Sequence, residues 1–186
     1  PMSEVNKQIR LAARPTGFPT ASDFQLVSSP VPEPAEDEIL VKVIYLSVDP
    51  YMRGRMSDAK SYAAPVNIGD VMTGGGVGRV IRARNARFAE GDIVDGVTGW
   101  QEYAVLNGRG LRKFDPSLAP ISTALGVLGM PGLTAYFGLL DICKPKAGET
   151  VVVSGAAGAV GSLVGQIAKI QGCRAVGIAG TDDKVQ

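Results

Sequence analysis

The segment GAAGAVG at residues 155–161 has the residue types and the spacing of a phosphate-binding turn. Set against the pattern G-x-G-x-x-G, its key positions are Ala156, Gly158 and Gly161. The pattern requires a tight turn, a backbone bare enough for a pyrophosphate to approach, and close packing of a helix on a strand. Ala156 meets the first requirement imperfectly, whereas the two glycines meet the others. A helix that begins here would offer free N–H groups to the phosphates, so we predict a dinucleotide site. The alternative is that these small residues serve only helix–sheet packing.

The end of the next expected strand indicates which dinucleotide is bound. NAD sites place Asp or Glu about 20 residues after the turn, on the ribose 2′-hydroxyl. Here residue 178 is isoleucine, and the strand ends in Gly180 and Thr181 without an acid. This small turn leaves room for a 2′-phosphate, and Lys184 can supply the counter-charge, so we favour NADP(H). In the alternative interpretation the acidic pair 182–183 caps a helix and Lys184 is an ordinary solvated lysine.

Several other kinds of site are excluded by residues that the chain lacks. It contains no histidine, and residues 1–142 contain no cysteine, so no catalytic metal site of Cys and His ligands can be built there. A His-based triad is excluded for the same reason. No G-x-x-x-x-G-K-[ST] segment occurs, which excludes a P-loop. The glycine run 74–78 continues into a strand pattern rather than a helix, so we interpret it as structural.

Charge, hydropathy and cysteine count indicate which classes of partner and which cellular location to expect. Nineteen basic and 18 acidic residues give a net charge of +1 without a long block of one sign, so we expect no nucleic-acid partner. No run approaches the ~18 to 20 apolar residues of a membrane span, so we expect no membrane partner. Two cysteines do not make a disulfide framework, and a reducing, cytoplasmic location is the default.

The first 120 residues have the pattern of β-structure with turns. Residues 38–46 alternate and are rich in Val and Ile, and further strand patterns cover residues 73–82, 92–97 and 101–106. Strands at such intervals, separated by Gly or Asp, predict a small antiparallel barrel or sandwich.

The pattern changes near Ser122, where a second domain is expected to begin. Short helices are predicted at 122–128 and 134–140, around a turn at residues 129–132. The apolar run 151–154 does not alternate, as is typical of a parallel strand buried on both faces. With the helix at 160–171 and the strand at 174–179 it makes one βαβ unit.

Six segments in order resemble a known family. They are DPYMRGRM (49–56), GGGVGRV (74–80), GDIV (91–94), GWQEY (99–103), GMPGLTAYFGL (129–139) and AAGAVGSLVGQIAK (156–169). Together they are similar to the zinc-free medium-chain dehydrogenase/reductases, in the branch of prostaglandin reductases, leukotriene hydroxydehydrogenases and alkenal (enone) reductases. The resemblance covers essentially the whole chain. It implies a GroES-like catalytic β-barrel over residues 1–122, followed by the first βαβ part of an α/β Rossmann domain over residues 123–186.

The resemblance also implies an activity: NADPH-dependent, zinc-independent reduction of the carbon–carbon double bond of α,β-unsaturated ketones and aldehydes. Tyr51 is the candidate catalytic phenol, with a core tyrosine at a strand end as the alternative. Tyr62 lines the substrate channel or lies on a mobile loop, and Trp100 is expected to pack. The expected cofactor-binding residues are Met130, Thr134, Gly158, Ala159, Val160, Gly161, Gly180, Thr181 and Lys184.

Two other functions stay open at this stage. One is an NADPH:quinone reductase of the same superfamily. The other is a catalytically inactive fragment or nucleotide-binding module, because a doubly wound domain typically has six strands and only two are evident here. We therefore expect the chain to be part of a longer reductase that is a homodimer at full length.

Overall fold

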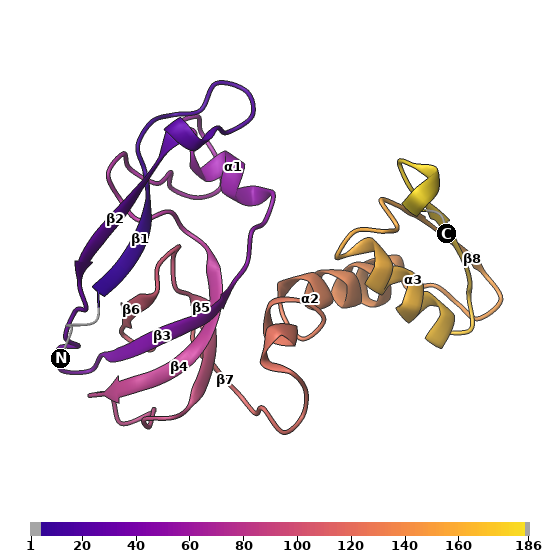
Figure 1. Cartoon of the computed structure of the whole chain (residues 1–186). Helices are drawn as coiled ribbons and strands as arrows, with labels where there is room; N and C mark the ends of the chain where they lie inside the picture. The colour runs from indigo at the N-terminus through magenta and orange to yellow at the C-terminus, as the bar shows by residue number, and fades with distance from the viewer. Residues whose placement is uncertain (1–4, 185–186) are drawn as a thin grey trace. The chain divides into compact units, whose positions relative to one another are not determined.

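The computed structural model describes residues 5–184, which form two units with a boundary between Ser122 and Thr123 (Figure 1). The outermost residues of both predicted domains, 1–4 and 185–186, lie outside the described part of the chain. Within residues 5–184, no helix combines the length and the apolar character needed to cross a bilayer.

The first unit is built on an antiparallel sheet of five strands in the order β6-β3-β4-β5-β7. These are β3 (Ile39–Leu46), β4 (Gly75–Ala83), β5 (Ile93–Val97), β6 (Tyr103–Leu106) and β7 (Arg112–Phe114). Apolar residues from three neighbouring strands form its core together with Phe88, which lies between β4 and β5. On each strand, alternate side chains point to the same face. The buried members of the core are Ile39, Val41, Val80, Phe88 and Val94.

A separate antiparallel pair, β1 (Val5–Leu11) and β2 (Phe24–Pro30), completes the strands of this unit. The sequence analysis predicted neither strand; in β1, VNKQIRL carries more polar than apolar residues. A distant contact secures β1: the Asn6 amide donates to the Tyr103 carbonyl oxygen at 2.9 Å and accepts from the Tyr103 N–H at 2.9 Å. Asn6 is only 1% exposed, so these bonds satisfy a polar group that burial would otherwise penalise.

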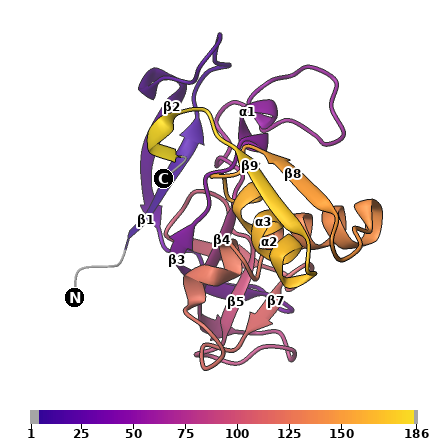
Figure 2. The ribbon, with the colours of Figure 1, turned by 90° about the vertical axis from the view of Figure 1, so that its right-hand side faces the viewer.

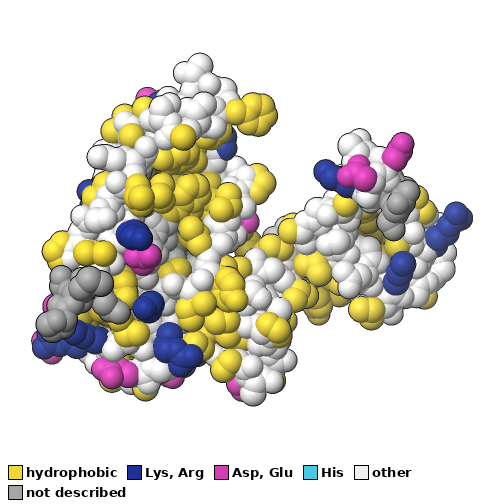
Figure 3. Space-filling view, viewed as in Figure 1, with side chains coloured by type: hydrophobic (Ala, Val, Ile, Leu, Met, Phe, Trp, Pro, Cys, Tyr) yellow, Lys and Arg dark blue, Asp and Glu magenta, His cyan; other side chains and the backbone are white. Residues whose placement is uncertain are grey.

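The short helix α1 (Tyr51–Arg55) packs between these parts through sulfur-rich side chains. Met52, Met56 and Met72 are buried with Leu11, and partly buried aromatic residues pack against them. Trp100 is one of these and stacks on Phe24 with ring centroids 5.7 Å apart, which agrees with its expected packing role. Figure 3 shows hydrophobic side chains reaching the surface between β1 and α1.

The second unit carries one parallel strand pair, β8 (Thr150–Ser154) and β9 (Arg174–Ile178), joined by α3 (Gly161–Ile170). Figure 2 shows the two strands side by side with the helix packed on one face. Buried Leu139, Ala168 and Cys173 form the core beneath that helix. The predicted βαβ unit is therefore present, with boundaries within one residue of those expected.

The segment before β8 differs from the expected pair of short helices around a turn. A 3-10 turn covers Ile121–Leu125, α2 covers Met130–Tyr136, and a π-helical stretch follows over Phe137–Cys143. The expected turn at 129–132 is wrong, since three of its four residues lie within α2. Pro131 is tolerated there because a proline in the first turn removes only an N–H that has no partner within the helix.

Candidate functional site

The carboxyl ends of β8 and β9 lie next to each other, with Ser154 and Ile178 in register. At this edge the chain turns sharply at Gly155, whose φ is +60°, a left-handed conformation that favours glycine. The N–H of Ala156 then donates to the Ile178 carbonyl oxygen at 3.0 Å, which ties the turn to the end of β9. In parallel α/β sheets, ligands bind at this edge.

The tight turn is made by Gly155 rather than by Ala156, the residue that the motif alignment assigned to it. The signal was present in the sequence, because Gly155 directly precedes the aligned positions, but the pattern does not indicate which residue carries the positive φ. A Cβ on Gly161 would overlap the Gly155 carbonyl oxygen, so the third motif glycine is required by close packing. Gly158 donates its N–H to the same oxygen at 2.9 Å.

Helix α3 begins directly after this turn and leaves N–H groups without partners. Among the described residues, nothing accepts a hydrogen bond from the backbone N–H of Ala159, Val160 or Gly161. Unpaired N–H groups and the positive end of the helix dipole make such a terminus favourable for anions.

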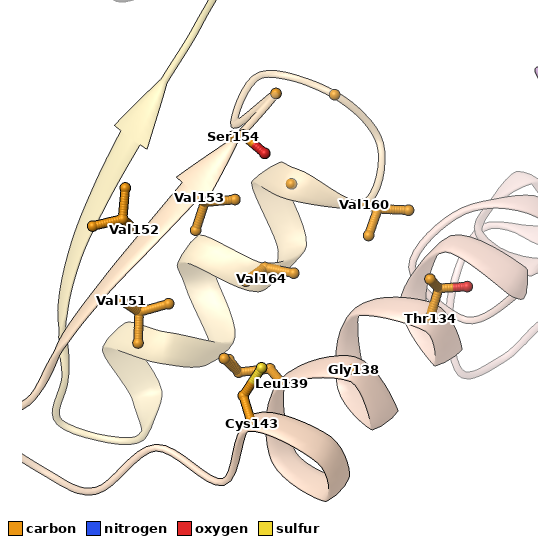
Figure 4. Close-up of a pocket in the computed structure, with 13 residues that line it drawn as sticks. Thr134, Gly138, Leu139, Cys143, Val151, Val152, Val153, Ser154, Val160 and Val164 are labelled. Atoms are coloured by element: carbon orange, nitrogen blue, oxygen red, sulfur yellow. The ribbon is translucent and has the colours of Figure 1, made fainter.

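Two cavities open on either side of the turn. The larger, of about 540 Å³, lies between α2 with its π-helical extension, β8 and α3 (Figure 4). Figure 4 shows Leu139 and Cys143 at one end of it and Thr134 and Val160 toward the other. Apolar side chains dominate its wall, and Ser154 and Thr134 supply hydroxyl groups. Thr134 uses its hydroxyl to donate to the Met130 carbonyl oxygen at 2.7 Å.

The smaller cavity, of about 250 Å³, lies between the glycine turn and the end of β9. Gly158 lines it from the turn, and Gly180 and Lys184 line it from the segment after β9. Lys184 ends a 3-10 turn over Asp182–Lys184 and lines the same cavity as Gly155 and Gly158 of the glycine turn.

The predicted cofactor residues divide between these cavities. Gly158 borders both, Thr134, Val160 and Gly161 border the larger one, and Gly180 and Lys184 border the smaller one. Met130, Ala159 and Thr181 border neither. Residues of the walls that sequence reasoning missed include Cys143, Ala157, Val164 and Ala179, none of which carries a recognisable motif signal.

Tyr51 belongs to the first unit, where it begins α1. Its ring is partly buried against the methionine cluster. Among the described residues, none forms a hydrogen bond with its hydroxyl. Burial raises the pKa of Tyr51 above its ordinary value, and the nearby Asp49 carboxylate raises it further, whereas the Arg55 guanidinium lowers it. The phenol is therefore protonated at neutral pH and can donate a hydrogen bond.

Acidic and sulfur side chains do not gather into a metal site within residues 5–184: no group of three or more His, Cys, Asp or Glu residues lies close enough to hold an ion.

Comparison with known proteins finds a matching family model and several similar proteins. Residues 7–114 match a family model described as the N-terminal domain of oxidoreductase. The chain is 51% identical over 179 residues to the NADPH-dependent curcumin reductase of Escherichia coli (strain K12). The aligned residues cover 96% of this chain and 52% of the relative. It is also 46% identical over 186 residues to the 2-alkenal reductase (NADP(+)-dependent) of Nicotiana tabacum. Here the aligned residues cover 97% of this chain and 54% of the relative.

A similar solved structure is that of CurA from Vibrio vulnificus in complex with NADPH. The TM-score is 0.88 at 56% identity, over 95% of this chain and 52% of that one. The chain thus spans about half the length of the curated relatives it matches.

Proposed function

Since the chain belongs to the zinc-free medium-chain dehydrogenase/reductase family, with a GroES-like first domain and the first βαβ part of a Rossmann domain, we propose that it reduces the carbon–carbon double bond of α,β-unsaturated ketones and aldehydes with NADPH. The observation that carries the proposal is the meeting of Lys184 with the glycine turn around one cavity. Two relatives named as NADP-dependent reductases and a neighbour bound to NADPH support it.

The residues at the turn fit a dinucleotide phosphate. The close approach at Gly161, the left-handed Gly155 and the unpaired N–H groups of Ala159 and Val160 leave bare backbone where a phosphate would bind. Lys184 would pair with the 2′-phosphate across the smaller cavity, and Gly180 and Thr181 would leave room for it. Met130 and Thr134 would lie on the nicotinamide side, with Thr134 on the wall of the larger cavity.

NADPH supplies, when bound, the hydride that adds to the β-carbon of the substrate. The part of this chain is to bind and orient the carbonyl group on which negative charge develops. Tyr51 is our candidate donor: its protonated hydroxyl, which no described residue binds, would donate a hydrogen bond to that oxygen as the charge forms. A proton from water or a neighbouring acid then completes the reduction at the α-carbon.

The direct test is cofactor consumption by the purified full-length protein. We expect NADPH to be oxidised in the presence of a simple 2-alkenal or enone, with little rate from NADH. The same assay with a quinone panel separates the alternative: turnover of quinones alone would assign the protein to quinone reduction instead. An absence of turnover on enals, enones and quinones would refute the reductase proposal.

Replacement of Lys184 tests the cofactor choice separately. In Lys184→Ala we expect the KM for NADPH to rise about tenfold or more, since a charge-assisted contact is lost, and the KM for NADH to stay within twofold. Lys169, an exposed lysine at the end of α3, supplies the matched control Lys169→Ala. Equal effects of Lys184→Ala on both cofactors would rule out the 2′-phosphate role.

A further inference from the structure

Arg55, the last residue of α1, lies against two tyrosine rings. Its guanidinium carbon is 6.0 Å from the centroid of the Tyr51 ring and 5.5 Å from that of Tyr62. Tyr51 and Arg55 are four residues apart on one helix, which places them on the same face. Tyr62 comes from the loop that follows, so the guanidinium joins two segments through contacts with aromatic rings.

Arg55 also forms hydrogen bonds with the backbone of this loop, through its side chain and through its own carbonyl oxygen. The Nη1 of Arg55 donates to the Ala64 carbonyl oxygen at 2.8 Å, and the Arg55 carbonyl oxygen accepts from the Val66 N–H at 2.8 Å. At the base of the loop, Arg14 donates to the carbonyl oxygens of Met56 and Val66 at 3.0 and 2.6 Å. The base of the loop is therefore closed without the Arg55 side chain, by Arg14 and by the Arg55 backbone. Among these contacts, the part of the loop that carries Tyr62 is held by the Arg55 side chain alone.

The two aromatic rings that Arg55 contacts differ in their exposure to solvent. Tyr62 is 85% exposed, whereas Tyr51 is partly buried. The Nε of Arg55 is buried and has no hydrogen-bond partner among the described atoms, so its side chain is held chiefly by the ring contacts and the Ala64 bond.

We propose that Arg55 is a positioning residue: it holds Tyr62 and the loop at residues 57–66 against the guanidinium that also contacts Tyr51, and this loop forms one wall of the substrate site. This role rests on the proposed function for its chemistry, because Tyr51 is the candidate donor to the substrate carbonyl. The planar guanidinium is suited to it: it contacts a ring and donates to Ala64 in the same orientation, which the point charge of lysine does not reproduce.

The loop itself offers a readout that needs no activity, since Lys60 is an exposed site for trypsin. We expect Arg55→Met to accelerate cleavage after Lys60 about fivefold, measured by mass spectrometry, because the contacts to Tyr62 and Ala64 are lost. Tyr62→Ala should have a similar effect, and the double variant should add little to either. Arg53→Met is the matched control: Arg53 lies on the same helix but donates to Pro15 and Gly17, so cleavage after Lys60 should not change.

Steady-state kinetics with a 2-alkenal then tests the positioning role. In Arg55→Met the KM for the alkenal should rise about fivefold, while kcat and the KM for NADPH stay within twofold. A structural defect would instead lower the amount of active enzyme and thus kcat. Unchanged cleavage after Lys60, or faster cleavage with an unchanged alkenal KM, would overturn the proposal. If no enal, enone or quinone is turned over, the proposed function fails, while the cleavage experiment still decides whether Arg55 holds the loop.

Discussion

The two parts of the Tyr51 side chain have different surroundings: the ring is packed, and the hydroxyl is our candidate hydrogen-bond donor. Its ring packs on the methionine cluster, while the described residues leave its hydroxyl without a partner. Burial and Asp49 raise its pKa and Arg55 opposes them, so the phenol stays protonated over the physiological range. A core tyrosine at the end of a strand stays the alternative, and it predicts no effect on kcat when the hydroxyl is removed.

A conservative substitution separates these roles. Tyr51→Phe keeps the ring and its packing, so we expect the thermal midpoint to change by no more than ~2 °C. Loss of one donor at a developing oxyanion costs about 100-fold in kcat, which we expect here. Trp100→Phe, which retains a ring on Phe24, serves as a control with little effect on kcat. An unchanged kcat and KM in Tyr51→Phe would remove this residue from the mechanism.

At the scale of elements, the turn between β8 and α3 depends on glycines at defined places. A Cβ on Gly161 would overlap the backbone of Gly155, which cannot yield as a flexible side chain would. Gly165, four residues along the same helix, has open space around its Cβ position.

We therefore expect Gly161→Ala to destabilise the protein by about 2 kcal/mol and to weaken NADPH binding at least tenfold. In Gly165→Ala the helix gains propensity, and stability should rise by up to about 1 kcal/mol. Urea unfolding and a fluorescence titration with NADPH measure both effects. Equal stabilities for the two variants would contradict the close packing at Gly161.

A charged pair links two other elements of the first unit. Asp92, just before β5, accepts from Lys113 of β7 at 2.7 Å and from the Ala89 N–H at 2.9 Å. These bonds, the Lys113 bond foremost, hold the pKa of Asp92 below its ordinary value of 3.8. A carboxyl with a lowered pKa in the folded state stabilises it above that value, and the contribution is lost as the pH falls through the folded pKa.

The isosteric Asp92→Asn should accordingly cost up to about 1 kcal/mol at pH 7, because the pair lies near the surface. The difference from the parent should shrink steadily as the pH drops below 3.8. Chemical unfolding at several pH values measures it, and Asp58→Asn in the exposed loop serves as the control. A difference that persists unchanged at the lowest pH would exclude the ionic origin.

At the scale of the whole molecule, the parallel sheet has only two strands among the described residues. One face packs on α3, whereas Val152 and Ile178 are 62% and 56% exposed. A doubly wound domain covers both faces of its sheet, so this unit presents apolar surface that such a domain buries. The chain spans about half the length of the curated relatives it matches.

The glycine turn, α3 and Lys184 are nevertheless complete in this chain, which leads to a prediction about binding. Calorimetric titration of the 186-residue protein with NADPH should give a dissociation constant in the micromolar range and a clearly weaker one for NADH. At 100 times that constant, NADPH should stabilise the second unit by ~2.7 kcal/mol. Undetectable binding of both cofactors would instead support an inactive fragment.

Much of the fold was predictable because its signals are local. The alternation of β3, the apolar run of β8 and the spacing of the glycines each act within a few residues, where backbone sterics and side-chain period decide the outcome. The lack of histidine likewise removed whole classes of catalytic site. β1 was missed because its stability depends on Asn6 reaching Tyr103, 97 residues away, and such a contact leaves no trace in the local pattern.

What the sequence by itself determined is therefore a βαβ unit with a dinucleotide turn after a β-rich domain, and a resemblance to one reductase branch. Only the tertiary structure decided that Gly155 makes the turn, that Lys184 borders the same cavity as Gly158, and that Arg55 lies against both Tyr51 and Tyr62. The physical reason is that a backbone conformation is selected by near neighbours, whereas the meeting of distant side chains depends on how complete elements pack.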